Sequence, residues 1–493
     1  MSSRHCSRPA ALGRQATSWR FTRSGLLLTS FLILPACATL APDGGMNVPA
    51  DIAARHLRKD VSVTRNEDDA AAVRARVAGL LRKPLSADAA VQLALLNNRG
   101  LQAAYNALGV ADAVRVQQSL PPRPSFELTR LSGAAEIELE RQIVGNILAL
   151  ATLPARTEIA NIRFRQAQLT ASLETLRIAA EARRAYYRAV AAQQVVKLFR
   201  DAGGASATST ELSRRMRDSG AMSKLDQSRQ QVLHAELSAD LTRAELRASS
   251  ERERLIRVLG LADERLSLKL PAALPPLPKR APNLRTAEQS ALDERVDLQA
   301  ARLDVEALAK SYGLTKATRF VNVLEGGYLD KKVDERAAGE HKHQSGFTVT
   351  FEVPLFDFGE ARTREAEQTY MHAVNRLAQK AVDVRSQARE AYRAWRLNYD
   401  LAQRYAREVV PLRKSMSEEQ MLRYGAMQID VFTLLTDIRQ QIASRVTATE
   451  VQRDFWLAST ELSAAIVGGN SANTDVASAG APAGGGDGDG EEH

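Results

Sequence analysis

The chain has 493 residues, which is enough for two or three ordinary globular domains. Only 5% of them are aromatic, while alanine, arginine, leucine, glutamine and glutamate predominate, which is typical of long helices and coiled coils. Five of the positive charges behind the net +9 lie in residues 1–36, and the other arginines alternate with glutamates along predicted helices. Without a basic block or an aromatic platform, no nucleic-acid partner is expected.

Residues 1–36 have the pattern of a signal peptide. Arginines up to Arg23 precede an apolar run, Gly25 to Leu34, that is too short to span a bilayer. The run ends at Leu34-Pro35-Ala36-Cys37, which resembles the lipobox of bacterial lipoproteins. The resemblance implies that Cys37 is lipidated and becomes the new N-terminus. It also favours the outer membrane, because no aspartate follows that cysteine.

Residues 37–84 are expected to form an extended arm with one short helix. The next segment, 85–270, begins with a helix from a cap at Ser86 to Pro121, because proline cannot donate to the helical ladder. Alternation of apolar and polar residues over 125–144, with a turn at Ser132-Gly133, predicts a β-hairpin.

A very long helix then begins at Pro154 and runs to about Arg217, interrupted only at Gly203-Gly204. Some sixty residues would make a rod of about 90 Å, which must pack laterally to bury its apolar face. A returning helix is expected from about Leu225 to Leu259, and the proline-rich residues 271–283 read as a stiff linker.

Residues 284–467 repeat this plan. We expect a helix over 284–318, strands over 321–331 and 346–353, and a charged loop over 332–344 between them. A second long helix should run to Tyr424 and a last one from Val431 to Val467. Residues 468–493 are rich in glycine, alanine, serine and aspartate and are expected to be a disordered tail.

Matching landmarks support a tandem duplication. Leu101-Gln102-Ala103-Ala104 corresponds to Leu298-Gln299-Ala300-Ala301, and Gly220-Ala221-Met222 corresponds to Gly425-Ala426-Met427. The fold class is therefore mainly helical, with two long helical hairpins and four strands per chain. Four strands of about ten residues have the length of membrane-crossing strands, but they leave two open edges that lipid does not tolerate. Three chains would close a twelve-stranded barrel.

Three sets of residues carry a resemblance to a known family. They are the paired Leu-Gln-Ala-Ala segments, Gly220-x-x-Ser223-x-Leu225-Asp226, and Val353-Pro354-Leu355-Phe356-Asp357-Phe358-Gly359-x-x-Arg362. In this order, over about residues 85–467, they resemble the TolC-like outer-membrane efflux proteins, and the lipobox is similar to their lipoprotein branch. The resemblance implies a homotrimer whose β-barrel opens into a periplasmic α-helical barrel. It also implies partners, namely a periplasmic adaptor protein, an inner-membrane pump and outer-membrane lipid.

Members of this family close the periplasmic end of the tunnel near the hairpin turn, often with aspartates. Asp430 and Asp437 are the predicted gate residues, with helix capping by Asp430 as the alternative. Asp226 has the family's spacing from Gly220, whereas Asp430 comes one residue early relative to Gly425.

The predicted function is a passive exit duct of a tripartite efflux or secretion system, not an enzyme. No nucleophile elbow, phosphate loop or metal-binding motif is present, and no cofactor beyond a covalent lipid on Cys37 is expected. His341 and His343, beside Glu340, are too few for a stable metal site. The alternative is a periplasmic coiled-coil adaptor or structural lipoprotein without a barrel. The exported substrate cannot be inferred from the sequence.

Overall fold

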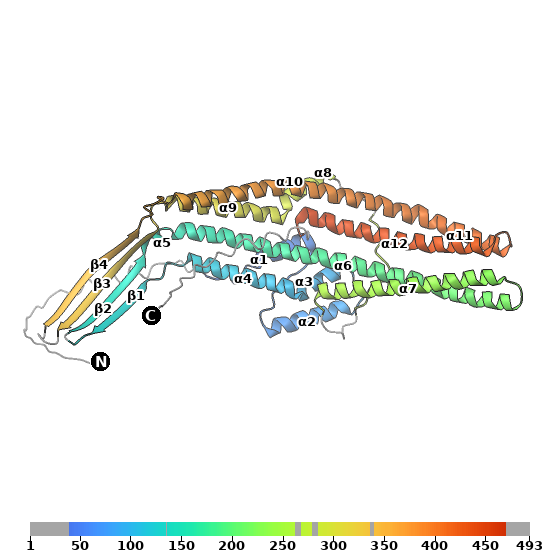
Figure 1. Ribbon diagram of the computed structural model, residues 1–493, viewed down its shortest axis with the longest axis horizontal. Coiled ribbons are helices and arrows are strands. Elements are labelled where there is room, and N and C mark those ends of the chain that lie inside the picture. Colours follow the sequence, from blue (N-terminus) through green and yellow to red (C-terminus); the bar gives the residue numbers. More distant parts are fainter. Residues whose placement is uncertain (1–38, 135, 262–267, 279–283, 336–339, 470–493) are drawn as a thin grey trace, which may run out of the picture. The chain divides into compact units, whose positions relative to one another are not determined.

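The computed structural model describes residues 39–134, 136–261, 268–278, 284–335 and 340–469. The predicted signal peptide, Cys37, the end of the linker and the tail from residue 470 lie outside these residues. The chain divides into two units after Leu40, and every described helix and strand belongs to the second unit. This unit is mainly helical with one four-stranded antiparallel sheet, so the predicted fold class is confirmed (Figure 1).

The first repeat has the expected order of elements. It consists of α3 (Ala87–Asn97), α4 (Arg99–Ser119), β1 (Ser125–Ser132), β2 (Glu136–Asn146), α5 (Ile147–Ala151), α6 (Leu153–Asp218) and α7 (Lys224–Leu259). The 66 residues of α6 include Pro154 in the first turn, where its missing N–H costs no hydrogen bond. The predicted interruption at Gly203-Gly204 was wrong, because α6 continues through both glycines.

The second repeat has the same plan with one irregular turn. Its elements are α8 (Leu284–Glu294), α9 (Val296–Ala317), β3 (Val323–Glu335), β4 (Glu340–Glu352), α10 (Glu360–Arg404), a π-helix (Tyr405–Val409), α11 (Val410–Gly425) and α12 (Val431–Val467). The π-helical turn ends two residues before Pro411, which cannot donate a backbone hydrogen bond. This turn was not predicted from the sequence.

The arm contains more helix than predicted. Its elements are α1 (Asn47–Ile52), a π-helical turn (Ala53–Leu57) and α2 (Glu67–Leu81). Asn66 caps α2 by accepting a hydrogen bond from the Asp69 amide at 2.7 Å. Three acidic residues in the first turn of α2 further stabilise its N-terminus, so the prediction of a single helix was wrong.

Two helices predicted to be continuous are each broken, and the breaks are equivalent. Asn98 separates α3 from α4, and Arg295 separates α8 from α9; each lies three residues before its Leu-Gln-Ala-Ala segment. Both have extended backbone, with φ and ψ of −70° and 118° at Asn98 and −67° and 114° at Arg295.

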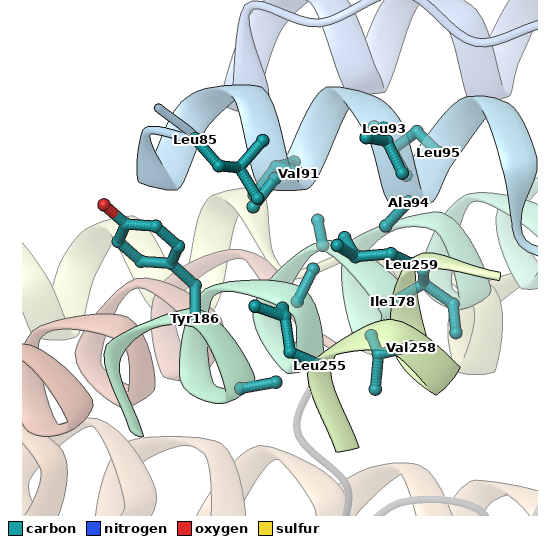
Figure 2. Packing of buried hydrophobic residues seen from close by; sticks show 14 of the residues in the cluster. Leu85, Val91, Leu93, Ala94, Leu95, Ile178, Tyr186, Leu255, Val258 and Leu259 are labelled. Atoms are coloured by element: carbon teal, nitrogen blue, oxygen red, sulfur yellow. The ribbon is translucent and has the colours of Figure 1, made fainter. Parts of the chain in front are cut away.

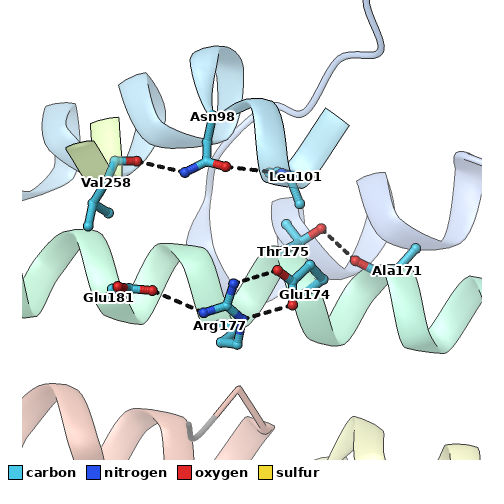
Figure 3. A network of polar contacts seen from close by, with 8 residues as sticks. All are labelled: Asn98, Leu101, Ala171, Glu174, Thr175, Arg177, Glu181 and Val258. Atoms are coloured by element: carbon cyan, nitrogen blue, oxygen red, sulfur yellow. Dashed lines mark hydrogen bonds and ion pairs between the residues drawn. The ribbon is translucent and has the colours of Figure 1, made fainter. Parts of the chain in front are cut away.

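The side chain at each break donates to the last turn of the returning helix. Asn98 accepts from the Leu101 amide and donates to the carbonyl of Val258 at 2.8 Å (Figure 3). Arg295 donates to the carbonyl of Ala465 at 3.3 Å. The breaks therefore join the start of each repeat to its end.

Four strands lie in the order β1-β2-β3-β4, all antiparallel. The central pair, β2 and β3, joins the two repeats, with Gln142 opposite Leu329. Strands β3 and β4 pair over their full thirteen residues, from Val323 opposite Glu352 to Glu335 opposite Glu340. Most of the predicted charged loop is therefore strand, and the loop prediction for 332–344 was wrong.

Helix α6 packs against elements of both repeats: α3, α4 and α7 from the first, and α9 and α12 from the second. Its buried Ile178 and Tyr186 belong to the largest hydrophobic cluster, with Val91 of α3 and Leu255 of α7 (Figure 2). The alanine-rich stretch of α6 allows this close approach, because small side chains bring helix axes together.

The proline-rich linker is bound to both repeats, and in the first repeat the Leu274 amide donates to Gln194 of α6 at 3.1 Å. The carbonyl of Pro275 accepts from Gln452 and from the indole N–H of Trp456, at 2.8 and 3.0 Å. Tyr399 donates to the carbonyl of Pro278 at 3.0 Å. Among the described helices, none combines the length and apolar character of a membrane-spanning helix.

Candidate functional site

One face of the sheet is apolar and exposed. Successive side chains of a strand point to opposite faces, so the register assigns every residue to one of the two. The apolar face includes Phe347, 87% exposed, opposite Tyr328, and Phe126, 74% exposed, opposite Ile143. Further exposed apolar residues on this face are Leu128, Val349 and Phe351. Exposed aromatic and aliphatic side chains in such a continuous band indicate contact with lipid or another protein.

The opposite face of the sheet is polar. It carries, for example, Thr348, Thr350 and Gln142 between glutamates and lysines. An apolar and a polar face on strands of this length are the pattern of a transmembrane β-barrel, whose apolar side meets lipid and whose polar side lines the lumen.

The end of the sheet at the β3–β4 turn is charged. His341 and His343 lie in β4, not in a loop, and each pairs with an aspartate of β3 on the same face. His341 Nδ1 lies 2.6 Å from Asp334 Oδ1, and His343 Nε2 contacts Asp330. On this face the charged end begins directly after the apolar pair of Tyr328 and Phe347.

Strands β1 and β4 form the two edges of the sheet, and each has only one neighbour in the chain. Their outer N–H and C=O groups have no strand partner within the described residues. An edge left open in this way pairs readily with another strand, and in lipid it must do so.

The two hairpin turns share one geometry. Gly220, with φ of 77°, and Met427, with φ of 58°, occupy the same left-handed position. The Gly220 amide donates to the carbonyl of Arg217, and the Met427 amide donates to that of Tyr424. The structural equivalent of Gly220 is therefore Met427 and not Gly425.

This correspondence explains the early aspartate of the second repeat. Three residues after the left-handed position, Ser223 caps α7 and Asp430 caps α12. Asp430 accepts from the Thr433 amide at 3.0 Å and is exposed. Hydrogen bonds from Thr433, first from its hydroxyl and then from its amide, lower the pKa of Asp430. Asp430 thus corresponds to Ser223, whereas Asp226 lies one turn into its helix.

Asp437 lies about two turns further along α12 and is buried, 7% exposed. Its Oδ2 atom has no hydrogen-bond partner among the described residues. Gln230, which holds the corresponding position on α7, is also buried and accepts a hydrogen bond from Ser209 at 3.3 Å. The structure therefore separates the predicted gate residues: Asp430 reaches solvent at the turn, and Asp437 lies among the helices.

The chain just after the predicted lipidation site is fixed by buried polar contacts. Asp112 of α4, 2% exposed, accepts from the Ala41 amide at 2.7 Å and pairs with Arg115. Gln168 of α6 donates to the carbonyl of Gly45 at 2.9 Å. Asp112 was not predicted from the sequence, because a single acid in a helix looks like a surface residue.

Comparison with known proteins agrees with these surfaces. The family model described as outer membrane efflux protein matches residues 287–418, which run from α8 through α9, β3, β4 and α10 into α11. Over these residues the second repeat is similar to the outer membrane efflux protein family. None of the curated protein sequences compared with the chain matches it.

Solved structures with the same fold also span part of the chain outside residues 287–418. CusC, described in terms of transmembrane channel formation, has a TM-score of 0.66 at 15% identity and covers 78% of this chain and 92% of its own. The CmeC outer membrane channel of Campylobacter jejuni has a TM-score of 0.66 at 15% identity and covers 78% of this chain and 86% of its own. The open state of the Neisseria gonorrhoeae MtrE outer membrane channel has a TM-score of 0.63 at 15% identity and covers 77% of this chain and 88% of its own. The predicted TolC-like fold is confirmed.

Proposed function

We propose that the protein is an outer-membrane channel, the exit duct of a tripartite efflux or secretion system. The observation that carries this proposal is the four-stranded sheet, with one apolar and one polar face and two open edges. The match of residues 287–418 to the outer membrane efflux protein family supports it, since this is a family of transport channels and not of enzymes. A coiled-coil adaptor is disfavoured, because a protein without a membrane barrel would leave the apolar face and the open edges of this sheet exposed to water.

Assembly as a homotrimer accounts for the open edges. Pairing β4 of one chain with β1 of the next would give twelve strands and leave no free edge. Exposed apolar residues on the helices are a second reason to expect a homotrimer. Helix α7 exposes Leu225, Val232 and Leu246, which recur at multiples of seven residues, the spacing of a coiled-coil seam. Exposed Leu412 and Leu422 of α11 provide apolar surface on the second hairpin for such a seam.

The test is the mass of the detergent-purified protein by analytical ultracentrifugation. A homotrimer that needs detergent for solubility is the expected result. A monodisperse monomer that stays soluble without detergent would contradict both the barrel and the channel.

We also propose that Cys37 carries the lipid anchor. What supports this is the sequence before it, where an apolar run too short to span a bilayer ends at Leu34-Pro35-Ala36-Cys37, which resembles a lipobox.

The periplasmic gate is proposed at the turn between α11 and α12, with Asp430 and Asp437 as its acidic residues. Three exposed copies of Asp430 would bring like charges together where the hairpins converge, and such a ring excludes anions and attracts cations. Asp437 has an unpaired buried oxygen, so movement of α12 would be needed to expose it. The same hairpin ends are the proposed contact with a periplasmic adaptor and, through it, with an inner-membrane pump.

A further inference from the structure

Charge is divided unequally between the two faces of the sheet. The apolar face bears Arg130, Arg141 and Lys332 against Asp330 and Asp334, a net charge of +1 with neutral histidines.

On the polar face, among the side chains that the structure describes, seven carboxylates oppose the two lysines Lys331 and Lys342, a net charge of −5. The seven are Glu127, Glu136, Glu138, Glu140, Glu325, Glu335 and Glu352. Although the chain as a whole is basic, the surface assigned to the lumen is therefore acidic.

The two lysines neutralise only part of this face. Lys331 pairs with Glu138, and Lys342 pairs with Glu335 at 2.5 Å, both toward the β3–β4 turn. At the other end of the strands, next to the helices, Glu325 lies opposite Thr350 and Glu352 lies opposite Val323. These two carboxylates are diagonal neighbours on the same face, and no ion pair joins either of them to another described residue.

We propose that Glu325 and Glu352 form the main cation-selecting ring of the channel, where the barrel meets the helices. This inference rests on the proposed channel. In a trimer the net charge of the polar face would be three times the −5 that its described side chains carry in one chain. The ring would hold six carboxylates at the junction of barrel and helices. A ring of one charge in a passage with low-dielectric walls raises the local concentration of counter-ions and repels ions of its own sign. The duct then favours cationic solutes, such as metal ions or protonated amines, over anions.

The experiment is a reversal-potential measurement on the full-length protein in planar bilayers under a KCl gradient. The parent channel should pass K⁺ in preference to Cl⁻. Glu325→Gln with Glu352→Gln, which changes the face from −5 to −3 per chain, should weaken this preference. Glu325→Lys with Glu352→Lys, which changes it to −1, should remove most of it. High salt should weaken the preference of the parent, because it screens the ring.

The matched control is Asp330→Asn with Asp334→Asn, which makes the same change in charge on the opposite face. These residues should leave the reversal potential unchanged, since they point away from the lumen. Equal shifts in reversal potential from the glutamate pair and the aspartate pair would overturn the proposal, as would a parent channel without cation preference. Neither result would contradict the proposed channel. A shift produced only by Asp430→Asn would place selection at the gate and also overturn it. No conductance from a folded trimer would contradict the proposed channel instead.

Discussion

Replacing Asp297 by asparagine tests whether the break between α8 and α9 is held by a buried ion pair. Asp297 Oδ1 lies 2.8 Å from Arg295 Nε, and the two side chains are 5% and 1% exposed. Its other oxygen lies 3.5 Å from Nζ of Lys380. Asparagine keeps the volume but removes the charge, so the guanidinium of Arg295 is left buried without its counter-ion. Breaking one partner of a buried pair costs about 3–5 kcal/mol, and we expect a loss of this size.

The assay is guanidinium unfolding in detergent at one fixed protein concentration, followed by tryptophan fluorescence. Trp395 and Trp456, the tryptophans that remain after residue 36, lie in or against the hydrophobic cluster that contains Ala465, and Arg295 donates to the carbonyl of Ala465. The double variant Arg295→Met with Asp297→Asn removes both charges and should recover most of the loss.

The exposed pair of Arg396 and Asp400 provides the control. Both side chains are 47% exposed, so Asp400→Asn should cost less than about 1 kcal/mol. If Asp297→Asn costs no more than this control, the buried pair does not stabilise the break and the reasoning is refuted.

Three other regions of the chain can be tested by simple substitutions. Burial raises the pKa of Tyr105 from 10.0 to about 12. The buried neutral phenol therefore contributes its full stability below pH 10, and this contribution is lost as the pH rises through 12. Tyr105→Phe should reduce the loss of stability at alkaline pH, as measured by unfolding at a series of pH values. Cys37→Ser should abolish acylation. If mass spectrometry of the parent protein shows a mature N-terminus other than lipidated Cys37, the proposed anchor is disproved. Asp430→Ala with Asp437→Ala should raise single-channel conductance, with Asp226→Ala as the control. Opening by the control variant alone would place the gate on the first hairpin.

The sequence alone determined the order and type of most elements, because long helices and strands depend on local patterns. The predicted ends of α7 and α12 agree with the structure to within one residue, since Gly260, with φ of 68°, and Gly468, with φ of 111°, end them. The tandem landmarks and the hairpin at 125–144 likewise depend on local patterns of glycine, proline and alternating polarity.

The breaks at Asn98 and Arg295 were decided by tertiary contacts. Helix propensity and periodicity continue across both positions, and only the carbonyls of Val258 and Ala465, more than 150 residues away, show why each side chain stops the helix. No signal in the local sequence reports a partner so distant along the chain.

The structure also decided the equivalence of the turns and the two faces of the sheet. Aligning Gly425 with Gly220 was natural by residue type, but the left-handed position belongs to Met427, and Asp430 thereby becomes a cap. The charge on each face depends on the register between strands of different repeats, which is set by long-range pairing. Local sequence determines which segments are helix or strand, whereas contacts between distant segments determine which side chains share a surface.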